Sequence, residues 1–191
     1  PVPAADEEED EEDFDSRPSS AAPVDILDTK RVQGLRNIKG TSAAQVTAVG
    51  AIGVAGLITG HKDGSVRLWV KGKQRSDEEG IRLGRHDGEV TSLVVVGRHA
   101  FSGSIDGSVR HWNTLKELCV GMLPGHVEGV TAMCAADDKA ASPEPTILAV
   151  AARDGGIRLW FVDREDYACL GIIVCPEPDT LITAICFDPD T

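Results

Sequence analysis

Three residues whose types could support catalysis occur close together in one stretch of the chain: His86, Ser102 and Asp106. In serine hydrolases a histidine takes the proton of the serine hydroxyl and an aspartate orients that histidine. Such an enzyme also needs an exposed nucleophile, an oxyanion hole and a substrate pocket. Ser102 follows Phe101 in a segment typical of a strand, and no Gly-x-Ser-x-Gly sequence surrounds it. The pattern therefore favours a structural hydrogen-bond relay, and we expect a protein that is not an enzyme.

Two other groups of residues could bind a small ligand. The glycine-rich run 50–56, followed by Gly60-His-Lys62, hints at a phosphate-binding loop, but the Gly-x4-Gly-Lys-Ser/Thr spacing is not met. His99 and His111 could bind a metal together with Cys119, but their spacing is not that of a compact metal site. We therefore predict neither a cofactor nor a metal, and we expect His111 to lie on the surface of its sheet.

One short phrase occurs three times and organises the chain. Each copy consists of apolar or small residues, an Asp-Gly pair, and an arginine two residues before a tryptophan. The tryptophans are 43 and then 48 residues apart, at Trp69, Trp112 and Trp160. A period of about 40–45 residues with four short strands per unit is typical of a propeller blade.

The alternation of apolar, polar and turn residues predicts an all-β chain with three four-stranded units over residues 41–84, 85–123 and 124–174. Two prolines place residues 139–145 in a loop. The expected strands are 45–50, 55–60, 65–70 and 81–84; 90–96, 99–104, 108–113 and 117–123; 130–135, 146–151, 156–162 and 168–174; and 181–187, which would begin a fourth unit in 181–191.

These units resemble the WD-repeat family of β-propellers over about residues 40–190. The Gly-His pair that precedes the first strand of a family repeat is present as Gly125-His126 and altered to Arg85-His86. The family's Trp-Asp ending is degenerate in all three units, since the tryptophans are followed by Val70, Asn113 and Phe161. The resemblance implies a partial propeller of about three antiparallel blades.

The resemblance also implies a buried polar tetrad in each blade: a histidine before the first strand, a hydroxyl in the second, an aspartate in the tight turn and a tryptophan in the third. In the family the aspartate binds one ring nitrogen and a second hydrogen bond satisfies the other, so we expect the complete second blade to be the best ordered. The matching positions are His86, Ser102, Asp106 and Trp112 in the second unit; His126, Asp154 and Trp160 in the third, where Val150 replaces the hydroxyl; and Thr59, Asp63 and Trp69 in the first, which lacks the histidine.

Family members usually bind partners on the face formed by the tight turns and the loops before the first strands. The residues just before the turn aspartates are Lys62, Ile105 and Arg153. An apolar residue between two cations fits a peptide with acidic and apolar groups, so we predict a partner-binding site there. The opposite face, with the 71–80 and 139–145 loops, is the alternative. The recurring arginines could read phosphate, but a solvated or acid-paired position is favoured: Arg67, Arg110 and Arg158.

Composition restricts the partners further. The 191 residues carry a formal net charge of −12, and nine acidic groups lie in residues 6–15. The remainder is only mildly acidic, so duplex nucleic acid is not an expected direct ligand. We expect residues 1–24 to form a disordered acidic tail, which either contacts a basic partner or only keeps the chain soluble.

The five cysteines form no Cys-x-x-Cys pair, which indicates free thiols in a reducing compartment, the cytoplasm or nucleus. The longest apolar run, Val46 to Thr59, is too short and too rich in glycine to cross a bilayer, so no membrane partner is expected.

Three blades do not close a ring, because propellers typically have four to eight. We therefore expect either a longer protein or blades supplied by another chain. The main functional hypothesis is a non-enzymatic scaffold for protein–protein interactions in a larger assembly. The alternatives are a substrate-receptor or regulatory propeller of a ubiquitin ligase or kinase complex, and a subunit of a ribonucleoprotein particle.

Overall fold

The computed structural model describes residues 44–53, 56–70, 80–123, 125–137, 145–163, 166–175 and 181–188. The chain divides into two units, and all of these residues lie in the second, Asn37–Thr191. The predictions for the 1–24 tail and for most of the 71–80 and 139–145 loops fall outside the described residues. Within those residues, no helix is long and apolar enough to span a membrane.

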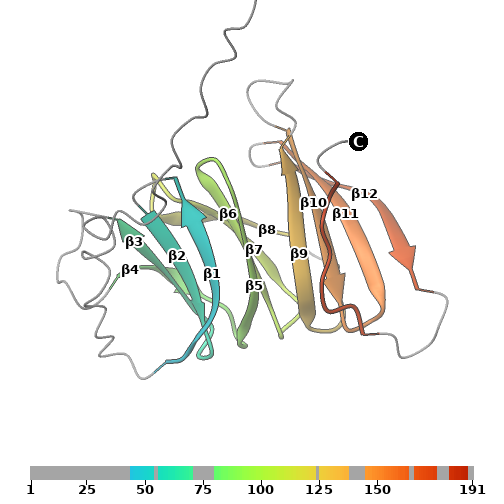
Figure 1. The fold of residues 1–191 in the computed structure, drawn as a ribbon, viewed down its shortest axis with the longest axis horizontal. Helices are drawn as coiled ribbons and strands as arrows, with labels where there is room; N and C mark the ends of the chain where they lie inside the picture. Colours follow the sequence, from blue (N-terminus) through green and yellow to red (C-terminus); the bar gives the residue numbers. More distant parts are fainter. Residues whose placement is uncertain are drawn as a thin grey trace, which may run out of the picture. The chain divides into compact units, whose positions relative to one another are not determined.

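The described residues form three antiparallel sheets of four strands, which confirms the all-β propeller architecture (Figure 1). We call these sheets the first, second and third blades. Each is a meander in which consecutive strands pair. The strands are β1 (Val46–Ile52), β2 (Gly56–His61), β3 (Ser65–Val70) and β4 (Ile81–Arg85); β5 (Val90–Val96), β6 (His99–Ser104), β7 (Val109–Asn113) and β8 (Leu118–Leu123); and β9 (Val130–Asp137), β10 (Pro145–Ala152), β11 (Gly156–Asp163) and β12 (Asp166–Val174).

Three of the predicted strands match the structure at both ends, and the other nine differ by one or two residues at one or both ends. The Asp-Gly turns explain this accuracy. Gly64, Gly107 and Gly155 all have positive φ values, between 73° and 84°, which a glycine adopts without the steric cost that a side chain would impose. The same turn chemistry therefore fixes the same hairpin in every blade.

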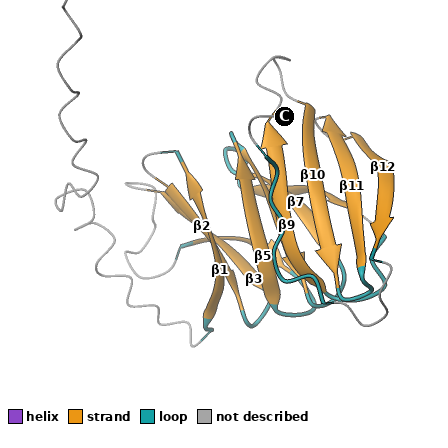
Figure 2. Cartoon of the chain, turned by 45° about the vertical axis from the view of Figure 1, so that its right-hand side comes forward, coloured by secondary structure: helices purple, strands orange, loops and turns teal. Residues whose placement is uncertain are grey.

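The predicted strand at 181–187 is wrong, because residues 181–188 form no strand. A strand needs a hydrogen-bonded neighbour, and no described residue pairs with this segment as a ladder. The segment instead runs beside β9 (Figures 1 and 2), where the backbone N–H of Phe187 hydrogen-bonds the Cys134 thiol. Burial raises the pKa of that thiol.

Adjacent blades are joined by apolar packing between their faces. Between the first and second blades, Trp112 packs with a buried cluster that includes Leu68 and Leu83. Between the second and third, Phe101 packs with a cluster that includes Leu148 and Trp160. The second and third blades thus turn their tryptophans toward the preceding blade, and both faces of the second blade are covered.

The inner strands of neighbouring blades also approach closely and exchange hydrogen bonds. The Thr47 hydroxyl donates to the Val90 carbonyl at 2.5 Å, and the Thr91 hydroxyl donates to the Val130 carbonyl at 2.6 Å. Glycine makes this approach possible, because a Cβ built on Gly103 would lie 2.5 Å from the Val130 side chain. The small residues in β2 and β6 therefore serve interblade packing.

We expect Gly103→Ala to lower the free energy of unfolding by about 1–3 kcal/mol, because the new methyl group overlaps Val130 and the inner strands must separate. Gly171→Ala is the matched control, since nothing lies within 4 Å of a Cβ at that position. Urea denaturation followed by tryptophan fluorescence measures both. Equal effects of the two substitutions would contradict the close interblade approach.

Candidate functional site

The second blade contains a continuous chain of hydrogen bonds that runs from the buried Trp112 to the exposed Asp106. The indole N–H donates to the Ser102 hydroxyl at 2.8 Å, and that hydroxyl lies 2.6 Å from His86 Nε2. His86 Nδ1 lies 2.8 Å from the Ser108 hydroxyl, which donates to Asp106 Oδ1 at 2.6 Å. Every polar group along the chain thereby has a partner.

The donor and acceptor of each bond follow from the two ends of the chain, because the Trp112 indole can only donate and the Asp106 carboxylate can only accept. Ser108 donates its hydroxyl proton to a carboxylate, so it accepts the proton of His86 Nδ1. His86 Nε2 is then unprotonated and accepts the hydroxyl proton of Ser102. Burial lowers the pKa of His86 to about 4, against an opposing effect from Asp106, so the ring is neutral at pH 7. The relay therefore operates with a neutral imidazole.

The structure brings together the four residues predicted for the second blade, but the aspartate reaches the histidine through a serine. Asp106 Oδ2 lies 3.7 Å from His86 Nδ1, beyond hydrogen-bond distance, and Ser108 bridges the two side chains. Sequence reasoning missed Ser108, although the repeated Asp-Gly-Ser triplet was visible. Ser102 is fully buried, so its hydroxyl is not presented to a substrate.

The first blade completes the same arrangement with a different histidine. The Trp69 indole donates to the Thr59 hydroxyl at 2.9 Å, and His61 Nε2 lies 2.9 Å from that hydroxyl. His61 Nδ1 lies 3.2 Å from the carbonyl oxygen of Ala44 and donates to it. His61 sits at the end of β2 and not before β1, so a motif search for the usual position could not find it. Asp63 instead accepts hydrogen bonds from Ser65.

The third blade has the histidine and aspartate but no hydroxyl. Gly156 replaces the bridging serine, and His126 Nδ1 contacts Asp154 Oδ2 directly at 3.2 Å. His126 Nε2 is buried and faces the Val150 carbonyl without a hydrogen bond of good geometry. Burial lowers the pKa of His126, although Asp154 opposes the shift. Val150 thus leaves this relay incomplete.

A second polar chain, which the sequence did not predict, links the second blade to the third. His99 Nδ1 lies 2.7 Å from His111 Nε2, and His111 Nδ1 lies 2.8 Å from the Tyr167 hydroxyl on β12. His111 also stacks on Phe101. His111 lies on the face of its sheet, as predicted, but the third blade covers that face and leaves His111 only 1% exposed. Burial and the neighbouring His99 lower its pKa to about 4.

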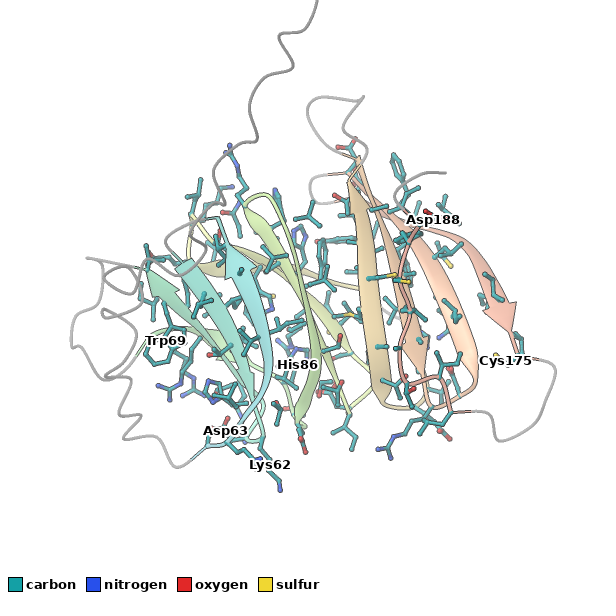
Figure 3. The ribbon with its side chains drawn as sticks, in the orientation of Figure 1. Lys62, Asp63, Trp69, His86, Cys175 and Asp188 are labelled. Atoms are coloured by element: carbon teal, nitrogen blue, oxygen red, sulfur yellow. The ribbon has the colours of Figure 1, made fainter. Side chains whose placement is uncertain are left out.

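The predicted partner-binding residues occupy three equivalent turns at one end of the blades. The backbone N–H groups of Lys62, Ile105 and Arg153 each donate to the segment before the first strand of their own blade. All three residues are exposed, and Figure 3 shows Lys62 pointing away from the sheets beside Asp63. We call these turns, with the loops 87–89 and 127–129, the rim.

The rim also has an apolar centre that sequence reasoning identified only in part. Ile105 remains 42% exposed and packs against Gly88 and Gly129 of the neighbouring loops. Val127, in the same loop as Gly129, is 87% exposed. Acidic residues lie around this centre, so the rim carries both signs of charge and not cations alone: Asp87, Glu89 and Glu128.

The other candidate ligands do not assemble into a site. Among the described residues, no group of three His, Cys, Asp or Glu side chains could hold a metal. The recurring arginines occupy equivalent positions opposite residues 59, 102 and 150. Arg158 Nη1 lies 3.5 Å from Asp154 Oδ2, which makes an ion pair without a hydrogen bond. The buried Nε atoms of Arg67 and Arg110 also lack a hydrogen-bond partner.

Comparison with known proteins agrees with this geometry. A family model described as WD domain, G-beta repeat matches residues 79–113 and 117–160. The two matched segments cover 79 of the 191 residues, and over them the chain is similar to WD40 repeats. Each matched segment begins at the outer strand of one blade and ends at the third strand of the next, so a sequence repeat and a structural blade are offset by one strand. WD40 propellers are generally non-catalytic domains for protein interaction.

A bromodomain and WD repeat-containing protein of Dictyostelium discoideum is 31% identical over 93 residues, which make up 48% of this chain and 4% of that protein. Two computationally designed proteins have similar structures. One, Ika8, has a TM-score of 0.58 at 23% identity, over 76% of this chain and 41% of its own. The other, Ika4, has a TM-score of 0.56 at 22% identity, over 78% of this chain and 82% of its own. These likenesses show the fold alone.

We expect Val150→Thr to give His126 Nε2 a hydroxyl partner. The substitution should therefore raise the free energy of unfolding more when His126 is present than when it has been replaced. A double-mutant cycle with His126→Phe should show a favourable coupling of about 0.5–1.5 kcal/mol, measured by urea denaturation. A coupling of zero would show that position 150 does not face the imidazole.

The two buried histidines predict a pH dependence of stability. His86 and His111 have folded-state pKa values of about 4 and an ordinary value of 6.5, so the unfolded chain binds more protons between these pH values. The free energy of unfolding should therefore fall as pH decreases from 6.5 to 4, by up to about 1.4 kcal/mol per pH unit for each histidine. His111→Gln should reduce this slope by one histidine's share, whereas parallel curves for the two proteins would contradict the burial of a neutral His111.

Proposed function

We propose that this chain is a non-enzymatic platform that binds other proteins within a larger assembly, and that one partner binds at the rim. The observation that carries the proposal is the pair of exposed aliphatic side chains, Ile105 and Val127, among charged groups. Exposed apolar residues surrounded by polar ones are typical of interaction sites.

The rim suits a partner because its geometry is fixed by buried contacts. The backbone of Ile105 is held by Glu89, and its side chain packs on two glycines. The relay from Trp112 to Asp106 holds the adjoining turn. A preorganised surface loses little conformational freedom on binding. We infer that the apolar centre anchors the partner and that Lys62 and Arg153 select charge at its edges.

The Dictyostelium relative is a bromodomain and WD repeat-containing protein, which supports a role for such repeats beside other domains in a larger protein. The receptor and ribonucleoprotein hypotheses are variants of this proposal that differ in the partner. We also propose a reducing compartment, the cytoplasm or nucleus, because all five cysteines are free thiols.

The test is quantitative affinity capture with Ile105→Asp combined with Val127→Asp. We expect the captured amount of each partner that binds at the rim to fall by at least about tenfold, because buried anchor residues supply most of the binding energy. Leu115→Asp is the matched control, because Leu115 is exposed but lies in the β7–β8 turn at the opposite end of the blade. Circular dichroism checks that the variants remain folded.

Further arms separate the alternatives. If Lys62→Glu with Arg153→Glu leaves every partner bound, the cations have no role. If nuclease treatment removes partners from the sample captured with the Leu115→Asp control, the ribonucleoprotein hypothesis is supported. Retention of all partners by the Ile105 and Val127 variant would refute binding at the rim.

A further inference from the structure

The outer strand of the third blade differs from the other outer strands in length and exposure. β12 has nine residues and lies at the edge of its sheet, next to β11. No charged residue occurs from Tyr167 to Cys175. Four large apolar side chains of β12 are more than half exposed: Leu170, Ile172, Ile173 and Val174. A long apolar edge strand is a ready template for pairing with another chain.

The other outer strands are shorter than β12, and β4 also carries charge. β4 has only five residues and carries the exposed cations Arg82 and Arg85, which discourage pairing. β8 has six residues, and its final side chain, Leu123, is buried between blades. β12 is also open around Gly171, where a Cβ would meet no atom within 4 Å.

The backbone of β12 presents hydrogen-bonding groups at its outer edge. The N–H of Cys175 donates to the Gly155 carbonyl at 3.2 Å, so the main chain of Cys175 faces β11. Main-chain groups alternate in direction along an antiparallel strand, and Val174 pairs with Gly156 while Ile172 pairs with Arg158. The N–H and C=O groups of Ile172 and Val174 therefore face outward.

The charges around β12 define the occupant. The sequence at the start of the strand, Asp163-Arg-Glu-Asp166, carries three acidic groups and one basic group, and Asp163 and Asp166 are exposed and directly opposite each other. Like charges in this arrangement are unfavourable, and a cation beside them would relieve the repulsion. A second copy of the chain would bring together two molecules that each carry a net charge of −12. A partner with basic residues avoids that repulsion.

We propose that β12 binds an extended apolar segment of a partner protein as a fifth, antiparallel strand, and that lysine or arginine at the C-terminal end of this segment lies beside Asp163 and Asp166. Main-chain hydrogen bonds supply the affinity, and side chains on both faces of the added strand cover the exposed residues of β12. The site is separate from the rim, so either proposal can fail without the other.

The probe is a labelled peptide with the sequence Val-Thr-Val-Ile-Val-Lys-Lys, titrated against the 191-residue chain by fluorescence anisotropy. We expect saturable binding that weakens as salt is added. Replacement of the two lysines by glutamate should weaken binding by at least about tenfold. N-methylation of the five residues before the lysines should abolish binding, because the main-chain N–H donors of those residues are lost. Equal binding of the N-methylated peptide would refute strand addition.

The variant Ile172→Pro removes an outward N–H without removing a hydrogen bond to β11, so the sheet should persist. Met122→Pro is the matched control on β8, because Met122 pairs with Arg110 as Ile172 pairs with Arg158. We expect at least about tenfold weaker peptide binding for the first variant and a change within about twofold for the second. Equal effects would place the peptide elsewhere.

Amide hydrogen exchange supplies a readout that does not depend on a variant. In the free protein, the N–H groups of Ile172 and Val174 should exchange rapidly and that of Cys175 slowly, and the peptide should protect the first two. If the N–H groups of Ile172 and Val174 still exchange rapidly when the peptide is bound, the proposed site on β12 is refuted. Sedimentation that shows a dimer abolished by Ile172→Pro would assign the edge to a second copy and overturn the proposed partner.

Discussion

The structure depends on a buried hydroxyl group that accepts the indole N–H of a tryptophan. Trp112 fills the space between two blades with no exposed surface, and its N–H would lose a hydrogen bond to water on burial if no acceptor were present. Ser102 provides that acceptor, and the Ser102 proton then requires an acceptor of its own, which is His86. Satisfying one buried donor thereby fixes the loop before β5 and the turn after β6, which are two of the segments that form the rim.

The three blades show that hydrogen-bond satisfaction matters more than the identity of a motif. The first blade replaces the usual histidine with His61 from its own second strand, and the indole and hydroxyl of that blade are still satisfied. The second uses Ser108 to carry the hydrogen bond to the aspartate, whereas the third has no bridging serine and uses direct contact. Loss of the family's Trp-Asp ending did not prevent any of these arrangements, because the residue after the tryptophan is not part of the relay.

Much of the fold could be predicted because its signals are local. Asp-Gly turns and alternating apolar residues define each hairpin, so the ends of β3, β5 and β6 were predicted correctly. Contacts between distant segments could not be predicted in this way. His111 is buried by Tyr167, 56 residues away, and alternation reports which face of a strand a residue occupies but not whether another blade covers that face. The 181–187 segment has the right pattern for a strand, yet pattern alone does not supply a pairing partner.

The same long-range contacts explain why residues from separate blades can form one surface. The second and third blades are joined by three contacts. The Thr91 hydroxyl hydrogen-bonds at the inner strands, the apolar cluster around Phe101 fills the middle, and the His111–Tyr167 hydrogen bond lies at the outer strand β12. Rotation about any one of these contacts is resisted by the other two. The first and second blades have the Thr47 hydrogen bond and the Trp112 cluster. Ile105 and Val127 come from the second and third blades, so these contacts limit how far the backbone segments that carry them can move relative to each other. A surface restrained in this way loses little conformational freedom when it binds a partner.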